Sequence, residues 1–415
     1  MGSYKYSRFN IIAEDSDDLV LLYNTYTLRY RYVDRVDLDD IYEKKDIDLG
    51  DVPVILSEEG FIVPDGVDEI RRLKADVRRH FERSDFMFIS VFVTLACNYR
   101  CSYCFEKEQL SGTEHMTRET AEELIDFIKR RYKEHPFSKP LRIKWFGGEP
   151  LLNMDIIRFI SGALKREGTD FTAKLYTNGR FLDRQNAKEL KELGVTDEVV
   201  IPLDGTAPNY ARLKGCSEAD FYETLMNIKN AEDILKTVIH INVSEETKED
   251  ALPLLKLLRE EFHIGSKIVP INVAPQNTDC IRKDNSIGFD DFRTVSDRIR
   301  SGRAGGIRRA YGCEGRHPDY YVVGTKGELY VCEHLIGQKE HQKGNIRDLS
   351  GRIDRHGTIW DSDRIIDDCS GCPLLPVCLG RCTSQRYLDH IDCEKEKRIK
   401  AAKERIMALA REAAV

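Results

Sequence analysis

This sequence lacks long apolar runs, an excess of positive charge and an N-terminal signal-peptide pattern. No apolar run approaches the ~20 residues that a membrane-crossing helix needs. Residues 1–18 lack the charged, apolar and small-residue succession of a signal peptide. The formal net charge is -7 and the pI is near 5.9, which argues against a nucleic-acid partner bound mainly through its phosphates. We therefore expect a cytoplasmic protein.

The ten histidines lack metal-ligand spacing, but twelve cysteines are present. Disulfides are disfavoured in a reducing cytosol, where clustered cysteines more often bind metal or carry out redox chemistry. Three cysteines lie at 97–104 and seven between residues 313 and 393, so only Cys216 and Cys280 are isolated. This distribution predicts two metal-binding regions. At 415 residues, the chain is long enough for two or three domains.

The first region is the segment 96–106, ACNYRCSYCFE, where Cys97, Cys101 and Cys104 are spaced C-x3-C-x2-C. Three thiolates on one loop can hold three irons of a 4Fe-4S cluster, whereas the usual count is four. One iron would then stay open to an outside ligand. A zinc site would need a fourth nitrogen or sulfur ligand nearby, and the nearest histidine, His115, lies eleven residues beyond Cys104. The spacing favours the open cluster over zinc.

Strand and helix patterns alternate from about residue 86 to residue 273. The predicted strands are 87–94, 141–146, 172–176, 198–203, 238–243 and 267–273. The predicted helices between them are 118–132, 155–165, 184–193, 219–235 and 249–262. Six βα repeats imply an α/β fold with a parallel sheet and helical crossovers. Ligands of such sheets bind at the carboxyl ends of the strands, and the first cysteine loop directly follows the first strand.

Polar or glycine-containing loops follow the next three strands. They are Gly147-Gly148-Glu149-Pro150, Thr177-Asn178-Gly179 and Asp204-Gly205. Paired glycines let a backbone approach a ligand closely, and a carboxylate can accept hydrogen bonds from an ammonium group. Each loop alone could be an ordinary turn.

The second cysteine region carries a longer pattern. Cys313 is followed by thirteen residues, Gly327, four residues, Cys332, a gap, Cys369-x2-Cys372-x5-Cys378-x3-Cys382, a second gap and Cys393. A zinc ribbon is the alternative interpretation, because C-x2-C is its common element. Seven cysteines together with the upstream triplet favour iron–sulfur clusters.

The first triplet, with Tyr103 before its last cysteine, resembles the signature of radical S-adenosylmethionine (SAM) enzymes. The resemblance implies a partial (βα)6 TIM barrel and a cluster whose open iron is chelated by the amino and carboxylate groups of SAM. It also implies a 5′-deoxyadenosyl radical that abstracts hydrogen from the substrate. The resemblance implies that Tyr103 contacts the adenine of SAM and that Arg212 neutralises its carboxylate. The methionyl amino group would be bound by Gly147, Gly148, Glu149 and Pro150. Asn178 and Asp204 are further implied cofactor-binding residues. Arg212 could equally be a surface residue.

The second region resembles the seven-cysteine SPASM domain, which implies two auxiliary 4Fe-4S clusters and so three clusters in all. One would be held by Cys369, Cys372, Cys378 and Cys393. The other would have Cys313, Cys332 and Cys382, completed by Cys280 or left with an open iron that could bind a substrate cysteine. In related sulfatase-maturing enzymes an acid at the position of Glu333 takes a substrate proton, so Glu333 is a candidate catalytic base. Its alternative is a surface or supporting role.

Four domains are expected. Residues 1–85 form a small mixed domain with β-rich runs at 9–12, 19–23 and 27–33 and helices at 37–44 and 67–81. It is either a cap or, by resemblance, a winged-helix-like element that holds a leader peptide by strand addition. Residues 86–300 form the barrel, with a last helix at 290–300. Residues 301–395 form the SPASM domain, beginning with a linker at 301–306. Residues 396–415 form a charged helix expected to be a solvated cap.

These resemblances predict a radical SAM/SPASM oxidoreductase that modifies a ribosomally made precursor peptide carrying a leader sequence. A Cys-to-carbon thioether crosslink is the predicted product. Carbon–carbon crosslinking and formylglycine formation in a sulfatase are the alternatives. The reductant would be of flavodoxin or ferredoxin type. An iron–sulfur electron carrier and a pure peptide-binding module are the alternatives from other classes.

Overall fold

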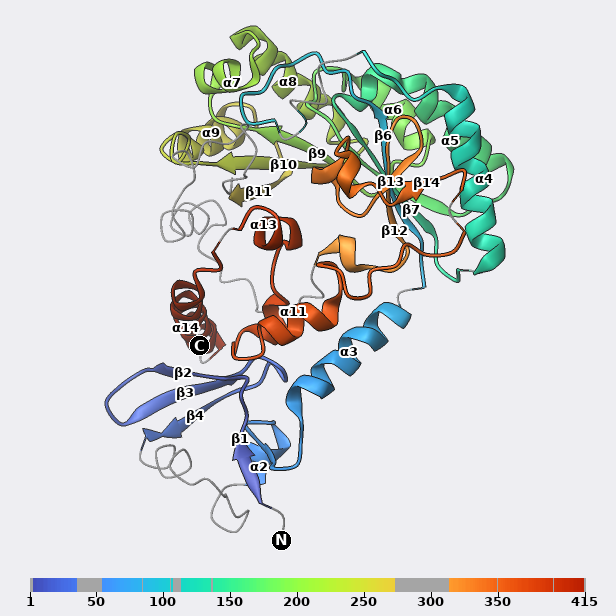
Figure 1. The fold of residues 1–415 in the computed structure, drawn as a ribbon. Helices are drawn as coiled ribbons and strands as arrows, with labels where there is room; N and C mark the ends of the chain where they lie inside the picture. The colour runs from blue at the N-terminus through green and yellow to red at the C-terminus, as the bar shows by residue number, and fades with distance from the viewer. Residues whose placement is uncertain are drawn as a thin grey trace. The chain divides into compact units, whose positions relative to one another are not determined.

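The computed structural model describes residues 3–35, 54–83, 85–104, 106, 113–135, 137–272, 313–348, 350–390 and 392–413. Cys280, the predicted helices at 37–44 and 290–300 and the predicted linker at 301–306 lie outside these ranges. The chain forms two compact units. The larger unit spans residues 85–302 and 317–354, and the smaller one spans residues 1–84, 303–316 and 355–415 (Figure 1).

A nine-stranded sheet forms the centre of the larger unit, in the order β11-β10-β9-β8-β7-β6-β12-β13-β14. Its strands are β6 (Phe88–Thr94), β7 (Leu141–Gly147), β8 (Phe171–Tyr176), β9 (Glu198–Leu203), β10 (Lys236–Val243), β11 (Lys267–Asn272), β12 (Tyr320–Val323), β13 (Glu328–Tyr330) and β14 (Gly344–Asn345). The six strands predicted from sequence pair in parallel, as expected. Strand β12 joins them in parallel with β6, so residues 317–354 extend the barrel sheet.

Helices connect these parallel strands and lie along the outside of the sheet (Figure 1). They are α4 (Arg118–Glu134), α5 (Met154–Arg166), α6 (Arg184–Glu192), α7 (Ala207–Lys214), α8 (Glu218–Ala231) and α9 (Ala251–Lys256), with 3-10 turns at Pro150–Asn153, Glu333–Leu335 and Lys339–His341 and a π-helical turn at Leu257–Glu261. Helix α7 was not predicted from the sequence. It ends at Gly215, which has a left-handed backbone, and α8 begins at once with a capping box between Ser217 and Asp220.

The smaller unit combines the two ends of the chain. Its elements are β1 (Tyr4–Tyr6), β2 (Asn10–Glu14), β3 (Leu19–Asn24), β4 (Tyr30–Asp34), α2 (Val54–Glu58), β5 (Ile62–Pro64), α3 (Glu69–Arg83), a 3-10 turn at Glu314–Arg316, α11 (Ser362–Asp368), α12 (Leu375–Cys378), α13 (Thr383–Tyr387) and α14 (Lys395–Ala413). Strands β2, β3 and β4 form an antiparallel sheet, and β1 pairs with β5.

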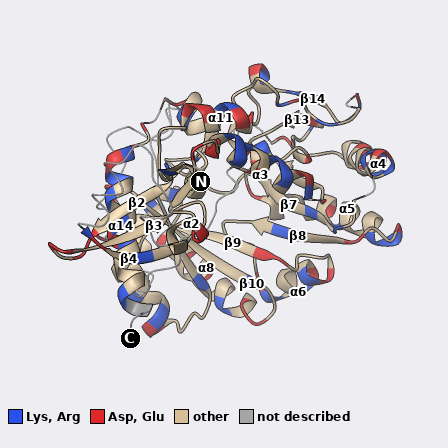
Figure 2. Ribbon diagram, turned by 90° about the horizontal axis from the view of Figure 1, so that it is seen from below, with Lys and Arg blue, Asp and Glu red and all other residues tan. Residues whose placement is uncertain are grey.

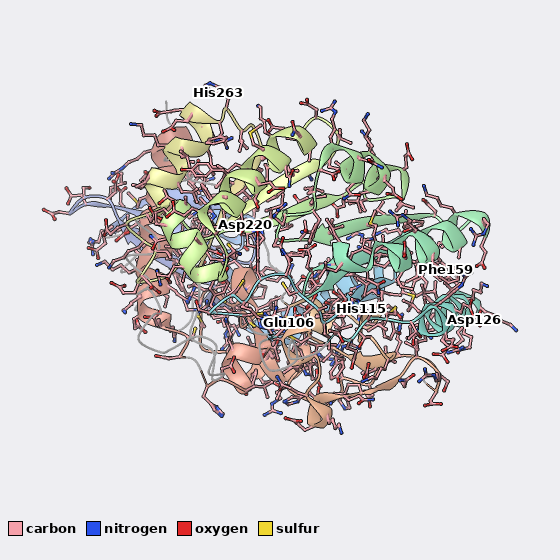
Figure 3. All side chains as sticks on the ribbon, turned by 90° about the horizontal axis from the view of Figure 1, so that it is seen from above. Glu106, His115, Asp126, Phe159, Asp220 and His263 are labelled. Carbon is pink, nitrogen blue, oxygen red and sulfur yellow. The ribbon has the colours of Figure 1, made fainter. Side chains whose placement is uncertain are left out.

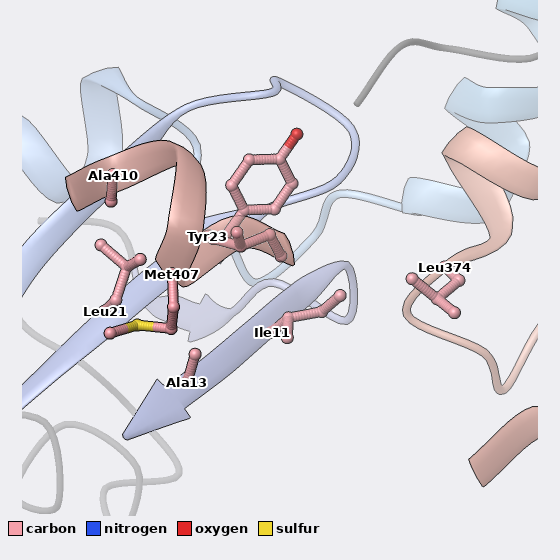
Figure 4. Packing of buried hydrophobic residues seen from close by; sticks show 8 residues of the cluster. Ile11, Ala13, Leu21, Tyr23, Leu374, Met407 and Ala410 are labelled. Atoms are coloured by element: carbon pink, nitrogen blue, oxygen red, sulfur yellow. The ribbon is translucent and has the colours of Figure 1, made fainter. Parts of the chain in front are cut away.

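The core of this smaller unit joins the strands to the last helix. Ile11 and Leu21 from β2 and β3 pack with Met407 and Ala410 from α14 (Figure 4). Leu374, beside the cysteine-rich segment, belongs to the same cluster. The closing helix therefore buries one face, where the sequence predicted a solvated cap.

Ion pairs connect α3 to α11 in the same unit. Lys74 Nζ lies 2.6 Å from a carboxylate oxygen of Asp367, and Arg78 pairs with Asp363. Figure 2 shows the basic residues along α3 and the acidic residues on α11. None of the described helices is long and apolar enough to cross a membrane.

Candidate active site

The first cysteine loop is anchored by backbone hydrogen bonds to two other loops at the carboxyl edge of the sheet. The amides of Arg100 and Ser102 donate to the carbonyls of Lys214 and Leu213, at the end of α7. The carbonyl of Ala96 accepts from the amide of Glu149, in the loop after β7, at 2.9 Å. Backbone atoms alone make these bonds, which tie the loop to the ends of β7 and α7.

Gly147 permits the close approach of β7 to the cysteine loop. Its φ is +126°, and a Cβ atom there would lie 2.1 Å from the carbonyl oxygen of Thr94. The next amide, that of Gly148, donates to the same oxygen at 3.0 Å. Pro150 is buried and begins the 3-10 turn that follows. Only glycine fits at position 147.

The Glu149 carboxylate joins two predicted loops. It is fully buried, and it accepts from the Thr177 hydroxyl and from the amide of Asn178, both at 2.8 Å. Burial raises the pKa of Glu149 to about 7, although these hydrogen bonds oppose the shift. The Asn178 side chain in turn donates to Asn98, between Cys97 and Cys101, at 2.8 Å. Glu149 and Asn178 thus lie in one network with the cysteine loop.

A buried ion pair lies next to Tyr103 of the loop. Lys214 Nζ is 2.8 Å from Asp204 Oδ2, and the exposed fractions of the two side chains are 2% and 1%. The Tyr103 hydroxyl donates to the same carboxylate, and Asn242 donates to its other oxygen at 2.6 Å. Burial alone would lower the pKa of Lys214, but Asp204 raises it well above its ordinary value. The lysine is therefore a fixed cation beside Tyr103.

Arg212 lies away from this network. Its side chain is 51% exposed and pairs with Glu246. Arg212 and Lys214 are two residues apart on one helix and so point about 200° apart around its axis. The role predicted for Arg212 stays a prediction, and Lys214 is the cation that the structure brings to the loop.

The thiols of this loop and their neighbours fit an anionic iron–sulfur cluster. Burial raises the pKa of Cys97 to about 11 and also raises those of Cys101 and Cys104, so the free thiols are neutral at pH 7. Iron would convert them to thiolates. The amide of Tyr99 donates to Cys97 Sγ at 3.4 Å, and Lys214 opposes the pKa rise at Cys101.

Glu106 is a buried carboxylate close to the thiols of this loop. Its side chain, labelled in Figure 3, is 3% exposed, and Oε2 has no hydrogen-bond partner among the described residues. Its charge raises the pKa values of Cys97 and Cys104, so it lies close to both. Within the described ranges, no three His, Cys, Asp or Glu side chains converge tightly enough to hold a single metal ion. The cysteines of a 4Fe-4S cluster stand further apart, because each binds a different iron.

Comparison with known proteins identifies a domain within this chain. Residues 91–258 match the radical SAM superfamily. This chain contains a radical SAM domain. It is 22% identical to the radical SAM cyclopropyl synthase TigE of Paramaledivibacter caminithermalis over 390 residues, which are 85% of this chain and 78% of that protein. It is 27% identical to the Fe-coproporphyrin III synthase of Methanosarcina barkeri over 191 residues, which are 43% of this chain and 45% of that one.

Solved structures share the fold of this chain. The structure of anSMEcpe with bound AdoMet and the Cp18Cys peptide matches with a TM-score of 0.59 at 17% identity, covering 79% of this chain and 99% of that one. Streptococcus suis SuiB bound to the precursor peptide SuiA matches with a TM-score of 0.52 at 14% identity, covering 91% and 95%. A radical SAM domain uses SAM and an iron–sulfur cluster, and the loop of Cys97 stays the predicted place for both.

The inner face of the radical SAM barrel carries a charged pair that the sequence did not reveal. Glu333 Oε1 accepts from Ser90 at 3.1 Å, Lys144 at 2.8 Å and Tyr320 at 2.5 Å. The Lys144 ammonium also lies 5.1 Å from the ring centre of Phe88. Burial would raise the pKa of Glu333, but Lys144 and these hydrogen bonds hold it at about 2. Such a carboxylate is ionised and a weak base at neutral pH, and its predicted role as a base stays a prediction.

The second cysteine region is divided between the two units. Cys313, Cys369, Cys372, Cys378, Cys382 and Cys393 belong to the smaller unit, and Cys332 belongs to the barrel unit. Cys378 and Cys393 both raise the pKa of Cys372, and Cys382 raises that of Cys313. The division of these cysteines into two cluster sets stays a prediction.

Sequence reasoning missed Lys214, Asn242, Lys144 and Tyr320. The alternation of inward positions could have indicated Lys144, because it lies on a strand directly beside Ser90. No sequence pattern indicated Lys214, because its position beside the cysteine loop depends on where α7 ends.

Proposed function

We propose that this chain is a radical SAM enzyme that modifies a ribosomally made precursor peptide. One observation carries the proposal. The cysteine loop, the Gly147 turn, the Glu149–Asn178 network and the Lys214–Asp204 pair meet at the carboxyl edge of one parallel sheet. Similarity in fold to structures solved with peptides supports a peptide substrate.

The residues of this edge have separable tasks. Cys97, Cys101 and Cys104 would hold three irons and leave the fourth open. SAM bound there supplies a 5′-deoxyadenosyl radical that abstracts a hydrogen atom. Gly147, which has no side chain, lets the loop after β7 lie against the backbone of Thr94. The Lys214 ammonium offsets negative charge on the cysteine loop.

The substrate would reach this edge along the inner face of the barrel. Lys144 and Glu333 offer a fixed cation and a fixed anion there, next to the rings of Phe88 and Tyr320. An extended peptide could meet both charges and pack its side chains on the rings. Residues 1–85 would hold its leader, and a flavodoxin- or ferredoxin-type protein would deliver the electron.

We propose a Cys-to-carbon thioether as the product. An auxiliary cluster on Cys313, Cys332 and Cys382 would have an open iron, unless Cys280 completes it. Such an open iron would offer a site for a substrate cysteine, since a coordinating thiol loses its proton. That sulfur would then bond to the carbon that lost its hydrogen atom to the 5′-deoxyadenosyl radical. The thiol proton would pass to solvent and the surplus electron to the auxiliary cluster, so that the peptide loses two hydrogens overall.

A carbon–carbon product is the second candidate, favoured by the similarity to TigE along 85% of this chain. Both products lose two hydrogens, but only the thioether consumes a thiol. Iodoacetamide would therefore alkylate a cysteine in the carbon–carbon product and not in the thioether. Formylglycine formed from cysteine would lose the sulfur itself.

The first experiment uses SAM alone. The full-length protein, anaerobically reconstituted with iron and sulfide and reduced with dithionite, should form 5′-deoxyadenosine. The Cys101→Ala variant should form none. If the wild-type protein formed none while holding iron, an electron carrier would be the better interpretation. Cysteine-bearing peptides encoded beside this chain are the first substrates to test by mass spectrometry.

A further inference from the structure

A buried arginine without a carboxylate partner lies in the cysteine-rich part of the smaller unit. Arg316 is 4% exposed. Its guanidinium donates to the Thr383 hydroxyl at 3.1 and 3.0 Å, to the carbonyl of Arg381 at 2.9 Å and to the carbonyl of Leu379. All of these acceptors are neutral, and no described carboxylate pairs with it. A buried charge without a counter-charge costs several kcal/mol, so an anion is expected nearby.

The ionisable neighbours that could supply this anion are Tyr387, which stays neutral at pH 7 because burial raises its pKa to about 12, and three cysteines. The thiols of Cys313, Cys369 and Cys378 all act on the Arg316 charge. Free thiols are weak counter-ions, because an ordinary thiol is mostly protonated and uncharged at pH 7. Bound to iron they would be thiolates. The uncompensated guanidinium therefore fits an iron–sulfur cluster with negative charge in this unit.

Arg316 also holds an unusual turn between two of these cysteines. Leu379, Gly380 and Arg381 have φ values of +42°, +71° and +62°, a left-handed run that costs energy at each non-glycine residue. The carbonyls of Leu379 and Arg381 are the ones that accept from Arg316. The turn joins Cys378 to Cys382, which the sequence assigns to different clusters.

A second arginine contacts a cysteine sulfur directly. Arg386 Nη1 lies 2.6 Å from Cys369 Sγ. Hydrogen bonds to cluster sulfurs and nearby positive charge favour the reduced cluster and so raise its reduction potential. Arginine keeps its charge at any pH that the protein survives.

We propose that Arg316 and Arg386 compensate the negative charge of a 4Fe-4S cluster on Cys369, Cys372, Cys378 and Cys393 and raise its reduction potential. This inference rests on the auxiliary clusters of the proposed function. Arg386 would act through its hydrogen bond to the sulfur of Cys369. Arg316 would act through its buried positive charge and through its hydrogen bonds to the turn at Leu379. Both are positioning residues, because neither is placed against substrate.

The test is a redox titration of the full-length protein followed by electron paramagnetic resonance. Cys97, Cys101 and Cys104 are replaced by alanine throughout, so that only auxiliary clusters give a signal. At the potential where this parent is half reduced, Arg386→Gln should lower the ratio of reduced to oxidised cluster about tenfold, which is 59 mV for one electron. Arg386→Lys should shift it less, because the charge stays.

The control is Arg364→Gln. Arg364 also lies over the ring of Tyr387, at 5.4 Å, as Arg386 does at 5.2 Å, but no hydrogen bond joins it to a described cysteine. Its variant should keep the parent potential. An unchanged potential in Arg386→Gln, at equal iron content, would overturn the proposal, and so would a parent that bound zinc and no iron.

Arg316→Leu tests the buried charge and has two readouts. In the parent that lacks the first three cysteines, we expect Arg316→Leu to bind less iron than Arg364→Gln. In a second protein that retains these cysteines, Arg316→Leu should still form 5′-deoxyadenosine, which would show that the barrel unit is folded. Equal iron content and an equal potential in Arg316→Leu would overturn its role. If Arg386→Gln shifted the reduction potential but the wild-type protein modified no peptide, this inference would stand and the proposed function would be refuted.

Discussion

At the scale of single residues, the Lys144–Glu333 pair is the most consequential feature of the barrel interior. The exposed fractions of the two side chains are 7% and 15%. Removing one partner of a buried pair leaves an uncompensated charge and typically costs about 3–5 kcal/mol. We expect Glu333→Gln and Lys144→Met each to lower the free energy of unfolding in urea strongly. The double variant should lose less than the sum of the two, and strictly additive losses would contradict the pairing.

The cation at the cysteine loop gives a second prediction at this scale. Lys214→Met should weaken SAM binding by the reconstituted protein at least tenfold, because Asp204 and Tyr103 lose the ammonium that orders them. Arg212→Met should bind SAM as the wild type does, since Arg212 is exposed and pairs with Glu246. Equilibrium dialysis with labelled SAM measures both. The reverse ranking would restore the role predicted for Arg212 from sequence.

His240 makes the stability of the barrel depend on pH. Burial and the nearby Lys174 lower its pKa from 6.5 to about 4. Between these values the unfolded chain binds more protons than the folded one, so stability is lost as pH falls from about 6.5 to 4, by up to about 1.4 kcal/mol for each pKa unit. In His240→Gln, the decrease in unfolding free energy that His240 causes between pH 6.5 and 4 should be absent. Urea unfolding at pH 7, 5.5 and 4 measures it, with the exposed His263→Gln as the control that should follow the wild type.

At the scale of elements, the loop after β7 depends on one glycine. Gly147→Ala would place a methyl group against the backbone of Thr94, which cannot move without breaking the pairing of β6 with β7. We expect reduced iron incorporation at the cysteine loop and a loss of several kcal/mol in unfolding free energy. Gly162→Ala is the matched control, because Gly162 lies within α5 and its new methyl group meets only the flexible end of Arg166. Iron analysis and urea unfolding compare the two.

The elements also show how far sequence could lead. The six parallel strands were predicted within about two residues, because their apolar runs are bounded by turns and end in Gly147, Asn178 and Asp204. Helix α7 was missed because it is short and lies between Gly205 and Gly215, with Pro208 near its start, a composition typical of a loop. The pairing of β12 with β6 joins residues more than two hundred positions apart. No local pattern encodes such a contact, so the sequence could not place Tyr320 and Glu333 on the inner face of the barrel.

For the whole molecule, the division into units differs from the order of the chain. The N-terminal strands, predicted as a domain of their own, share a core with α14 and with Leu374. Strand β2 and the last helix are almost four hundred residues apart in sequence. The cysteine-rich segment around Cys369 is therefore supported by both ends of the chain.

This shared core gives a prediction about truncation. Deleting residues 395–415 would expose Ile11 and Leu21 and remove Met407, and each buried apolar side chain contributes roughly 1.5–3 kcal/mol. Amide hydrogen exchange should then lose protection in β2 and β3 and keep it in β6 and β7, whose unit does not include α14. The point variant Lys403→Gln, on the exposed side of α14, should leave all four strands protected. Unchanged protection of β2 after the deletion would mean that α14 is only a solvated cap.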